Sequence, residues 1–255
     1  MSSDDPLFIQ SVERAFRVLE AFQQASQPLS LSEIAERAGT SKSNVQRACH
    51  TLLKLGYLER DARRAGLLPG KRLLERSFDF LRLDPLIERA TPVLADLRRA
   101  ADERVDFSLF DDVTLLYAIR NQSKRELQWR TVMGRRVPTF CTSGGRSILA
   151  RLDDAQVRDI LERSERKAYT PYTITSIDAL MGKVQETREA GYAVAVQEVL
   201  VGEIVVGAAV TDRDGRPVGA VHIAGSLSDW TVEDFARRFS PMASGAARAI
   251  SAYPG

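Results

Sequence analysis

The stretch LSLSEIAERAGTSKSNVQRACHTLLKLGYLERD, residues Leu29 to Asp61, decides the fold of the amino-terminal part of the chain. Ser30 and Glu33 form an S-x-x-E capping box, which predicts the start of a helix. Gly39 permits the positive φ of a tight turn, and Ser41 can cap the next helix. Two helices joined by a glycine-containing turn predict a helix-turn-helix.

An amphipathic helix is expected before this stretch and a wing after it. Across residues 11–25 apolar side chains recur at helical spacing, and the expected inward face carries Val12, Ala15, Phe16, Leu19 and Phe22. After Gly56 a short strand leads into a basic turn at residues 61–66. This turn predicts a two-stranded wing whose tip suits the DNA backbone or the minor groove.

The second helix of the pair carries outward-facing side chains that suit DNA recognition. Its inward stripe is expected at Val45, Ala48, Leu52 and Leu53. Lys and Arg reach phosphates and guanine, Asn and Gln match adenine, and Ser can bind phosphate at a helix start. The alternative is a merely solvated helix surface, but residues 42–50 contain no acidic side chain. The candidate DNA-binding residues are Ser41, Lys42, Ser43, Asn44, Gln46, Arg47, Arg63 and Arg64.

The charge distribution supports the same interpretation. The formal net charge is only +2, yet residues 41–72 hold eight basic and two acidic side chains. The rest of the chain therefore sums to −4. A basic segment in a slightly acidic protein is typical of phosphate binding.

Composition excludes several other classes of protein. The 255 residues, 44% hydrophobic and 27% charged, are typical of a globular chain that is long enough for two domains. The longest apolar or small run, residues 204–210, is far shorter than the roughly 18 residues of a membrane helix. The start MSSDD lacks a secretory pattern, so we expect a cytoplasmic protein without membrane contact. Two cysteines and two histidines predict neither a disulfide framework nor a metal site, and we expect no cofactor.

The remainder of the chain predicts a connector helix and an α+β domain. Residues 71–83 carry apolar side chains at helical spacing, which favours a dimer interface over packing on the chain's own domain. Strands are expected at 105–110, 113–119, 127–133, 192–199, 204–211 and 217–224, and helices at 86–97, 145–151, 154–163, 176–190 and 232–251. The expected divisions are a winged helix-turn-helix at 1–70, a linker helix at 71–84 and the second domain at 85–255.

The segment CTSGGRSILA, residues 141–150, predicts a place where an anion can bind. Ser143, Gly144 and Gly145 bring backbone amides to the start of a helix, which favours a carboxylate. Taken alone, the same residues are also consistent with a small-residue helix cap that binds nothing.

The chain resembles the IclR-type bacterial transcriptional regulators. The resemblance is carried by IQSVERAFRVLEAF, by the helix-turn-helix stretch and by GYAVAVQEVLVGEIVVGAAVTDRDG, in the family's order and over nearly the whole chain. It implies a winged helix-turn-helix, a linker helix and a GAF/PAS-like effector-binding domain. It also implies a homodimer or homotetramer that binds a partly palindromic operator on double-stranded DNA.

The resemblance also implies an effector site. The family's effector-binding loop corresponds to residues 141–150, and its GKA motif here is Gly145-Arg146-Ser147. The family's other pocket positions correspond to Ala195, Val205, His222 and Ala224, which are less polar than in relatives that bind small keto acids, and Trp129 could form a wall. This departure implies a small organic acid with an apolar or aromatic part. The segment also resembles regulators of aromatic acid catabolism.

Two alternatives to a ligand-responsive regulator stay open. Ser143 as a nucleophile with His222 as its base would make a hydrolase, although the chain lacks a G-x-S-x-G elbow, a P-loop, a dinucleotide fingerprint and a metal motif. A DNA-binding regulator without an effector would leave the long second domain unexplained. His222 itself could be either a core residue or a ligand contact.

Overall fold

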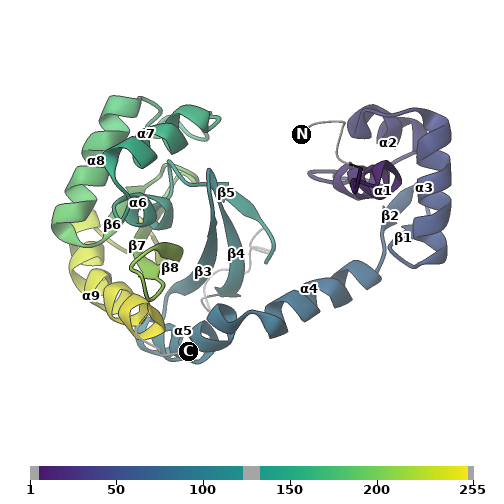
Figure 1. The fold of residues 1–255 in the computed structure, drawn as a ribbon. Helices are drawn as coiled ribbons and strands as arrows, with labels where there is room; N and C mark the ends of the chain where they lie inside the picture. Colours follow the sequence, from purple (N-terminus) through teal and green to yellow (C-terminus); the bar gives the residue numbers. More distant parts are fainter. Residues whose placement is uncertain (1–5, 123–132, 252–255) are drawn as a thin grey trace. The chain divides into compact units, whose positions relative to one another are not determined.

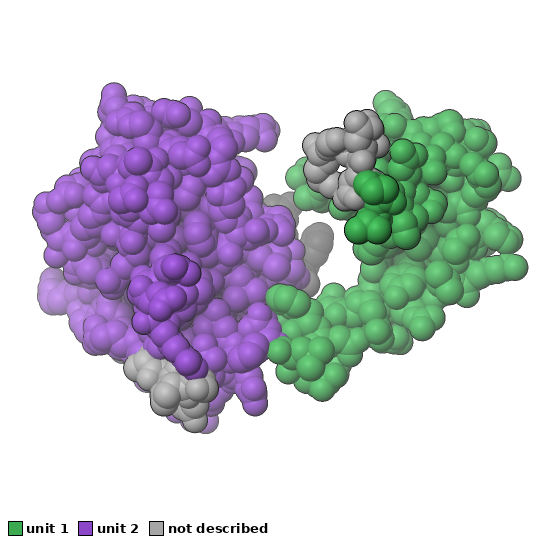
Figure 2. Space-filling view, in the orientation of Figure 1, with its two compact units in different colours: residues 1–83 green, residues 84–255 purple. Residues whose placement is uncertain are grey.

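The computed structural model describes residues 6–122 and 133–251. The chain divides into two compact units, Met1–Leu83 and Asp84–Gly255 (Figure 2). The first unit includes the helix that the sequence analysis separated as a linker, and the three-part division remains a prediction. The fold class is confirmed, because a helix-turn-helix unit precedes a unit of one sheet covered by helices (Figure 1).

Unit 1 begins with three helices and a small sheet. The helices are α1 (Gln10–Glu20), α2 (Leu31–Ala38) and α3 (Lys42–Lys54), followed by β1 (Leu58–Arg60) and β2 (Leu67–Pro69). Leu29 adds a bridge to this pair through reciprocal backbone hydrogen bonds with Leu67, of 3.0 and 2.8 Å. The wing is therefore tied to the segment that precedes α2.

The core of unit 1 corrects part of the expected inward face of α1. Leu19 and Phe22 pack, partly buried, against the core, but Val12 and Phe16 are exposed, and Val18 and Ala21 are buried instead. The expected apolar set and the observed one both recur at helical spacing, so periodicity alone could not choose between them. On α3 the expected stripe is confirmed for Val45 and Leu52, with Ala48 and Leu53 partly buried and Cys49 buried in addition, and all five belong to one core.

The last helix of unit 1, α4 (Arg72–Leu83), starts beside the wing. The Arg72 guanidinium donates to the Leu55 carbonyl at 2.9 Å and lies over the Tyr57 ring at 5.6 Å. No residue of α4 is buried. Its exposed apolar side chains are Leu74, Phe78, Phe80 and Leu83.

Unit 2 contains one antiparallel sheet in the order β5-β4-β3-β8-β7-β6. Residues 127–132 of one expected strand lie outside the described residues, and Met133 lies in a turn. The short strand β5 was not expected, and the strand expected at 192–199 is shorter because Gln197 adopts a φ of 57°. The strands are β3 (Arg104–Asp111), β4 (Thr114–Asn121), β5 (Arg136–Pro138), β6 (Ala193–Val196), β7 (Glu203–Thr211) and β8 (Pro217–Ser226).

Helices cover both faces of this sheet. On one face, α5 (Pro85–Ala101) contacts β3 and β4, and α9 (Val232–Ser251) contacts β7, β8 and α5. On the other face, α6 (Ser143–Leu149) packs on β7 and β8, and Figure 1 shows α7 (Asp154–Arg163) and α8 (Ile177–Ala190) farther out. The short helix α6 is therefore enclosed between the sheet and the outer helices.

Both cysteines are buried free thiols, Cys49 in unit 1 and Cys141 in unit 2. Burial raises the pKa of Cys49 to about 11. Burial, with the nearby charge of Glu198, raises the pKa of Cys141 to about 12. Both side chains therefore remain protonated near neutral pH.

Candidate nucleic-acid interface and candidate ligand cavity

The frame that presents α3 is built as the sequence analysis predicted. Ser30 Oγ accepts from the Glu33 amide, and the Glu33 carboxylate accepts from the Ser30 amide at 2.8 Å, which completes the capping box. Gly39 ends α2 with a φ of 61°, and Ser41 Oγ accepts from the Asn44 amide at the start of α3. These caps fix the turn between the two helices.

The outward face of α3 carries side chains of two kinds. Lys42, Ser43, Gln46 and Arg47 are exposed, as is the cap Ser41. Asn44 is half-buried and engaged at both ends of its amide. Its Nδ2 donates to Thr40 Oγ1 at 3.3 Å, and its Oδ1 accepts from Arg47 at 2.8 Å. Asn44 therefore orients Arg47, a role that the sequence analysis did not foresee.

The wing tip is ordered by an acid. Asp61 Oδ2 accepts from the backbone amides of Arg63 and Arg64, and the Asp61 amide donates to the Gly66 carbonyl at 3.1 Å. Both arginine side chains are exposed, and neither makes an ion pair within the described part of the chain. The fold thus offers cations at the tip of a constrained turn.

A cavity of about 30 Å³ lies in unit 2 between the start of α6, the sheet and the β6–β7 turn. A water molecule needs about 10 to 15 Å³, so the cavity has room for about two waters. Four predicted effector residues line it: Ser143, Ala195, Val205 and His222. Ser143 is 1% exposed, and its Oγ has no hydrogen-bond partner in the described structure.

The other predicted effector residues are placed differently. Gly144, Gly145 and Ala224 do not line the cavity, although Ala224 is buried on β8. The Gly145 amide donates to Thr142 Oγ1 at 3.1 Å, so the helix cap occupies it. A Cβ on Gly144 would lie 2.1 Å from the His222 ring, which explains the glycine by close packing. Trp129 lies outside the described residues.

The cavity has more polar side chains around it than the sequence analysis expected. Most of the lining residues are polar, and the sequence analysis did not name Tyr117, Thr142, Gln197, Glu198 and Glu203. The two acids could have been suspected, because both lie in the GYAVAVQEVLVGE stretch that carried the family resemblance. Tyr117 had no such signal, since it lies in an ordinary strand pattern.

Buried arginines neutralise both acids of the cavity. Glu198 makes a two-pronged pair with Arg146, at 2.6 and 2.5 Å, and both side chains are buried. Glu203 accepts from Arg104 at 2.6 Å. Arg104 and Arg120 also share Asp106 Oδ2 at 3.0 and 2.9 Å, yet burial still raises the pKa of the Asp106 carboxyl. The charges beside the cavity are thus already paired.

His222 is a buried neutral side chain. Its Nε2 lies 2.7 Å from Ser108 Oγ, and its ring centroid lies 5.5 Å from that of Tyr117. Burial, with the charges of Arg120 and Arg104, lowers the pKa of His222 to about 3. Because His222 pairs with Ser108 and the Ser143 hydroxyl is unpartnered, the base–nucleophile pair of the hydrolase alternative is not formed.

Two features of the described residues bear on other classes of protein. Within residues 6–122 and 133–251, no helix is long and apolar enough to cross a membrane. Within the same ranges, no three His, Cys, Asp or Glu side chains gather in a group that could hold a metal ion.

Comparison with known proteins identifies relatives of both units. Residues 11–62 match the IclR helix-turn-helix domain, and residues 79–252 match the bacterial transcriptional regulator IclR C-terminal domain. The Pca regulon regulatory protein of Pseudomonas putida is 30% identical over 245 residues, which cover 96% of this chain and 84% of that protein.

Solved structures agree with these matches. The Thermotoga maritima IclR structure has a TM-score of 0.74 and 28% identity, with 96% of this chain and 98% of that chain covered. An IclR homologue of Microbacterium hydrocarbonoxydans complexed with 4-hydroxybenzoate has a TM-score of 0.78 and 22% identity, with 95% and 98% covered.

Proposed function

The chain belongs to the IclR family of bacterial transcriptional regulators, and from that premise we propose that it binds an inverted-repeat operator as a dimer and senses a small organic acid. It is a DNA-binding regulator and not an enzyme, since its curated relatives are named regulators and repressors. We place it in the cytoplasm, with the chromosome.

The recognition surface is the outward face of α3 together with the wing tip. Lys42, Gln46 and Arg47 would enter the major groove, while Ser41 and Ser43 at the helix start would meet phosphate. Asn44 would act by orienting Arg47. Arg63 and Arg64 would contact the backbone or the minor groove. The observation that carries this proposal is the set of exposed cations on a frame whose caps are all formed.

The test is operator binding by full-length variants. Arg47→Ala should cost about 1 to 3 kcal/mol and relax base preference at one position in each half-site. Asn44→Ala should give a smaller loss at the same position, because it frees Arg47. Full affinity in a Gln46→Ala/Arg47→Ala double variant would refute the assignment of α3.

The dimer is proposed from exposed apolar side chains within unit 1. The large apolar side chains of α4 are exposed. Around α1, Phe8, Ile9, Val12 and Phe16 are exposed as well. Apolar surface of this kind marks an interaction site, and a two-fold interface presents two recognition helices. Sedimentation should show a dimer or a tetramer, and a monomer at micromolar concentration would contradict the proposal.

The effector site is proposed at the cavity beside α6. Ser143 Oγ carries this proposal, because a buried hydroxyl without a partner is costly and a ligand carboxylate would satisfy it. An aromatic acid is far larger than about 30 Å³, so binding must open the cavity. That requirement couples the ligand to a second conformation, as regulation needs. The fold can hold such an acid, as the Microbacterium protein does.

The ligand test is a melting screen with hydroxybenzoates, phenylacetates, dicarboxylates and short keto acids. An effector at about 100 times its Kd should stabilise the protein by about 2.7 kcal/mol. Ser143→Ala should weaken that effect. Ser147→Ala is the matched control, because its hydroxyl donates to the Gly144 carbonyl on the same helix and lies outside the cavity. Equal effects of both variants would place the site elsewhere, and a preference for short keto acids would refute the aromatic class.

A further inference from the structure

A second hollow lies within unit 1, between α3 and the wing. It has a volume of about 350 Å³, and its walls come from the start of α2, the second half of α3, β1 and β2. Gln46 lines it and also belongs to the outward face of α3. The hollow, called the α3–wing groove below, is therefore continuous with the proposed recognition surface.

Two basic side chains enter the α3–wing groove from opposite walls. His50 comes from α3 and Arg60 from β1, and both are exposed. Neither side chain makes a hydrogen bond or an ion pair within the described residues. The groove thus holds two donor groups without acceptors, one on each side.

Nearby acids are occupied elsewhere, and none of them lines the α3–wing groove. On α2, the Glu33 carboxylate accepts a hydrogen bond from the Ser30 amide. Its hydrogen bonds with Ser30 lower the pKa of Glu33. From β1, the Glu59 carboxylate accepts from the Lys71 amide at 3.2 Å. Two charged side chains lie one helical turn from His50 on α3. They are Arg47 and Lys54, and both are cations. The groove is therefore suited to an anion.

The spacing of the two walls is fixed. Gly66 in the wing is so close to the start of α2 that a Cβ there would lie 2.8 Å from Pro28. The hydrogen bonds between Leu29 and Leu67 hold the same two segments together. Leu58 and Leu67 of the wing also share one core with Val45, Cys49 and Leu52 of α3, so the backbones that carry the two donors are packed together without DNA.

We propose that the α3–wing groove holds one backbone phosphate of the bound duplex in each half-site, between the His50 imidazole and the Arg60 guanidinium. The proposal rests on the DNA-binding function proposed above and adds two positioning residues to it. Phosphate contacts of this kind set the register of a protein on DNA without reading sequence.

Both side chains are exposed and make no hydrogen bond or ion pair within the described residues, so each can turn toward a phosphate without breaking a contact of the fold. Removal of either donor should therefore weaken DNA binding and leave the stability of the fold nearly unchanged.

The experiment uses the full chain and a duplex that it selects from a random-sequence library. His50→Ala and Arg60→Ala should each weaken binding about threefold to tenfold, evenly across sequences. His50→Lys, which keeps a donor at the same place, should retain most of the affinity. Wild-type affinity in both alanine variants would overturn the proposal.

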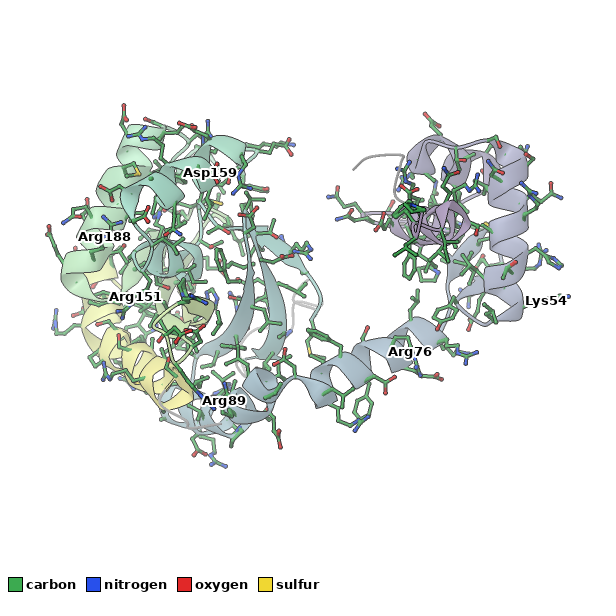
Figure 3. The ribbon with its side chains drawn as sticks, viewed as in Figure 1. Lys54, Arg76, Arg89, Arg151, Asp159 and Arg188 are labelled. Carbon is green, nitrogen blue, oxygen red and sulfur yellow. The ribbon has the colours of Figure 1, made fainter. Side chains whose placement is uncertain are left out.

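Neutral methylphosphonate linkages, placed one at a time in the same duplex, locate the phosphate. Wild type should lose affinity at several linkages in each half-site, and Arg60→Ala should abolish the loss at one of them. Lys54→Ala is the matched control, and the loss should persist in it. Lys54, labelled in Figure 3, is a cation at the end of α3 and does not line the groove.

The remaining outcomes separate this proposal from its premise. A full methylphosphonate effect in Arg60→Ala would overturn the groove assignment alone. Selection of no duplex at all would overturn DNA binding itself. Inorganic phosphate at millimolar concentration should compete with the duplex only weakly. Strong competition that His50→Gln removes would mean that the groove binds a free anion instead.

Discussion

Charged side chains are arranged in opposite ways in two regions of the molecule. One region is the surface formed by α3 and the wing, and the other is the cavity beside α6. In the first, cations such as Lys42, Arg60 and Arg64 stand exposed without partners within the described residues. In the second, Glu198 and Glu203 are already paired with arginines in a space of about 30 Å³. The first surface offers its cations as it stands, while the second is too small for an aromatic acid without rearrangement.

The two histidines make the same contrast. His50 is exposed on α3 without a partner within the described residues, whereas His222 is buried and neutral. Acidification should therefore weaken the fold through the buried histidine.

The largest expected effect comes from breaking the Arg146–Glu198 pair. Glu198→Ala leaves a buried guanidinium without its partner and should lower the free energy of unfolding of unit 2 by about 3 to 5 kcal/mol. Arg146→Met combined with Glu198→Met removes both charges and should cost much less. Urea unfolding of the full chain measures both. Equal losses would show that packing, not charge pairing, holds this wall of the cavity.

The next effect is the pH dependence of stability. The pKa of His222 is about 3 in the native protein, below the ordinary value of about 6.5 in the unfolded chain. Below about pH 6.5 the unfolded chain binds a proton that the native protein does not, so stability is lost as pH falls. The expected loss is about 1.4 kcal/mol per pH unit, or about 2 kcal/mol from pH 7 to pH 5.

Urea unfolding at several pH values tests this prediction. His222→Asn should flatten the slope by that amount relative to wild type. His50→Gln should leave the slope unchanged, because the His50 side chain is exposed without a partner. If both variants kept the wild-type slope, burial of His222 would not be its source.

The smallest effect is expected on the DNA-facing surface. Lys42→Ala and Arg64→Ala should change the free energy of unfolding by less than about 0.5 kcal/mol, because neither side chain makes a contact that stabilises the fold. The same variants should weaken DNA binding and reduce its salt slope by about 1. A large loss of stability would show that these cations have structural partners and would remove the contrast between the two regions.

Local chemistry explains what could be predicted from the sequence. The capping box at Ser30, the positive φ at Gly39 and the cap at Ser41 each depend on residues within a few positions of one another. The bounds expected for α7 and α9 are also those of the structure, because each helix has a strong apolar period. The family resemblance supplied the order of the two units.

Features that depend on distant partners were harder to predict. The buried face of α1 is decided by α2 and α3, and no local pattern shows which of two apolar stripes they meet. The polar lining of the cavity is assembled from β4, α6 and the β6–β7 turn, and its acids are stabilised by arginines far away in sequence. The sequence predicted that Asn44 contacts a DNA base, yet its side chain forms hydrogen bonds with Thr40 and Arg47.

The burial of both thiols makes the chain ready for labelling. Cys49 and Cys141 are buried with raised pKa values, so a maleimide dye should react with neither in the folded protein. A cysteine introduced at Lys54, at the exposed end of α3, would then be the reactive one without removal of the natural pair. Fluorescence energy transfer between two such dyes in a dimer would report the separation of the recognition helices with and without effector.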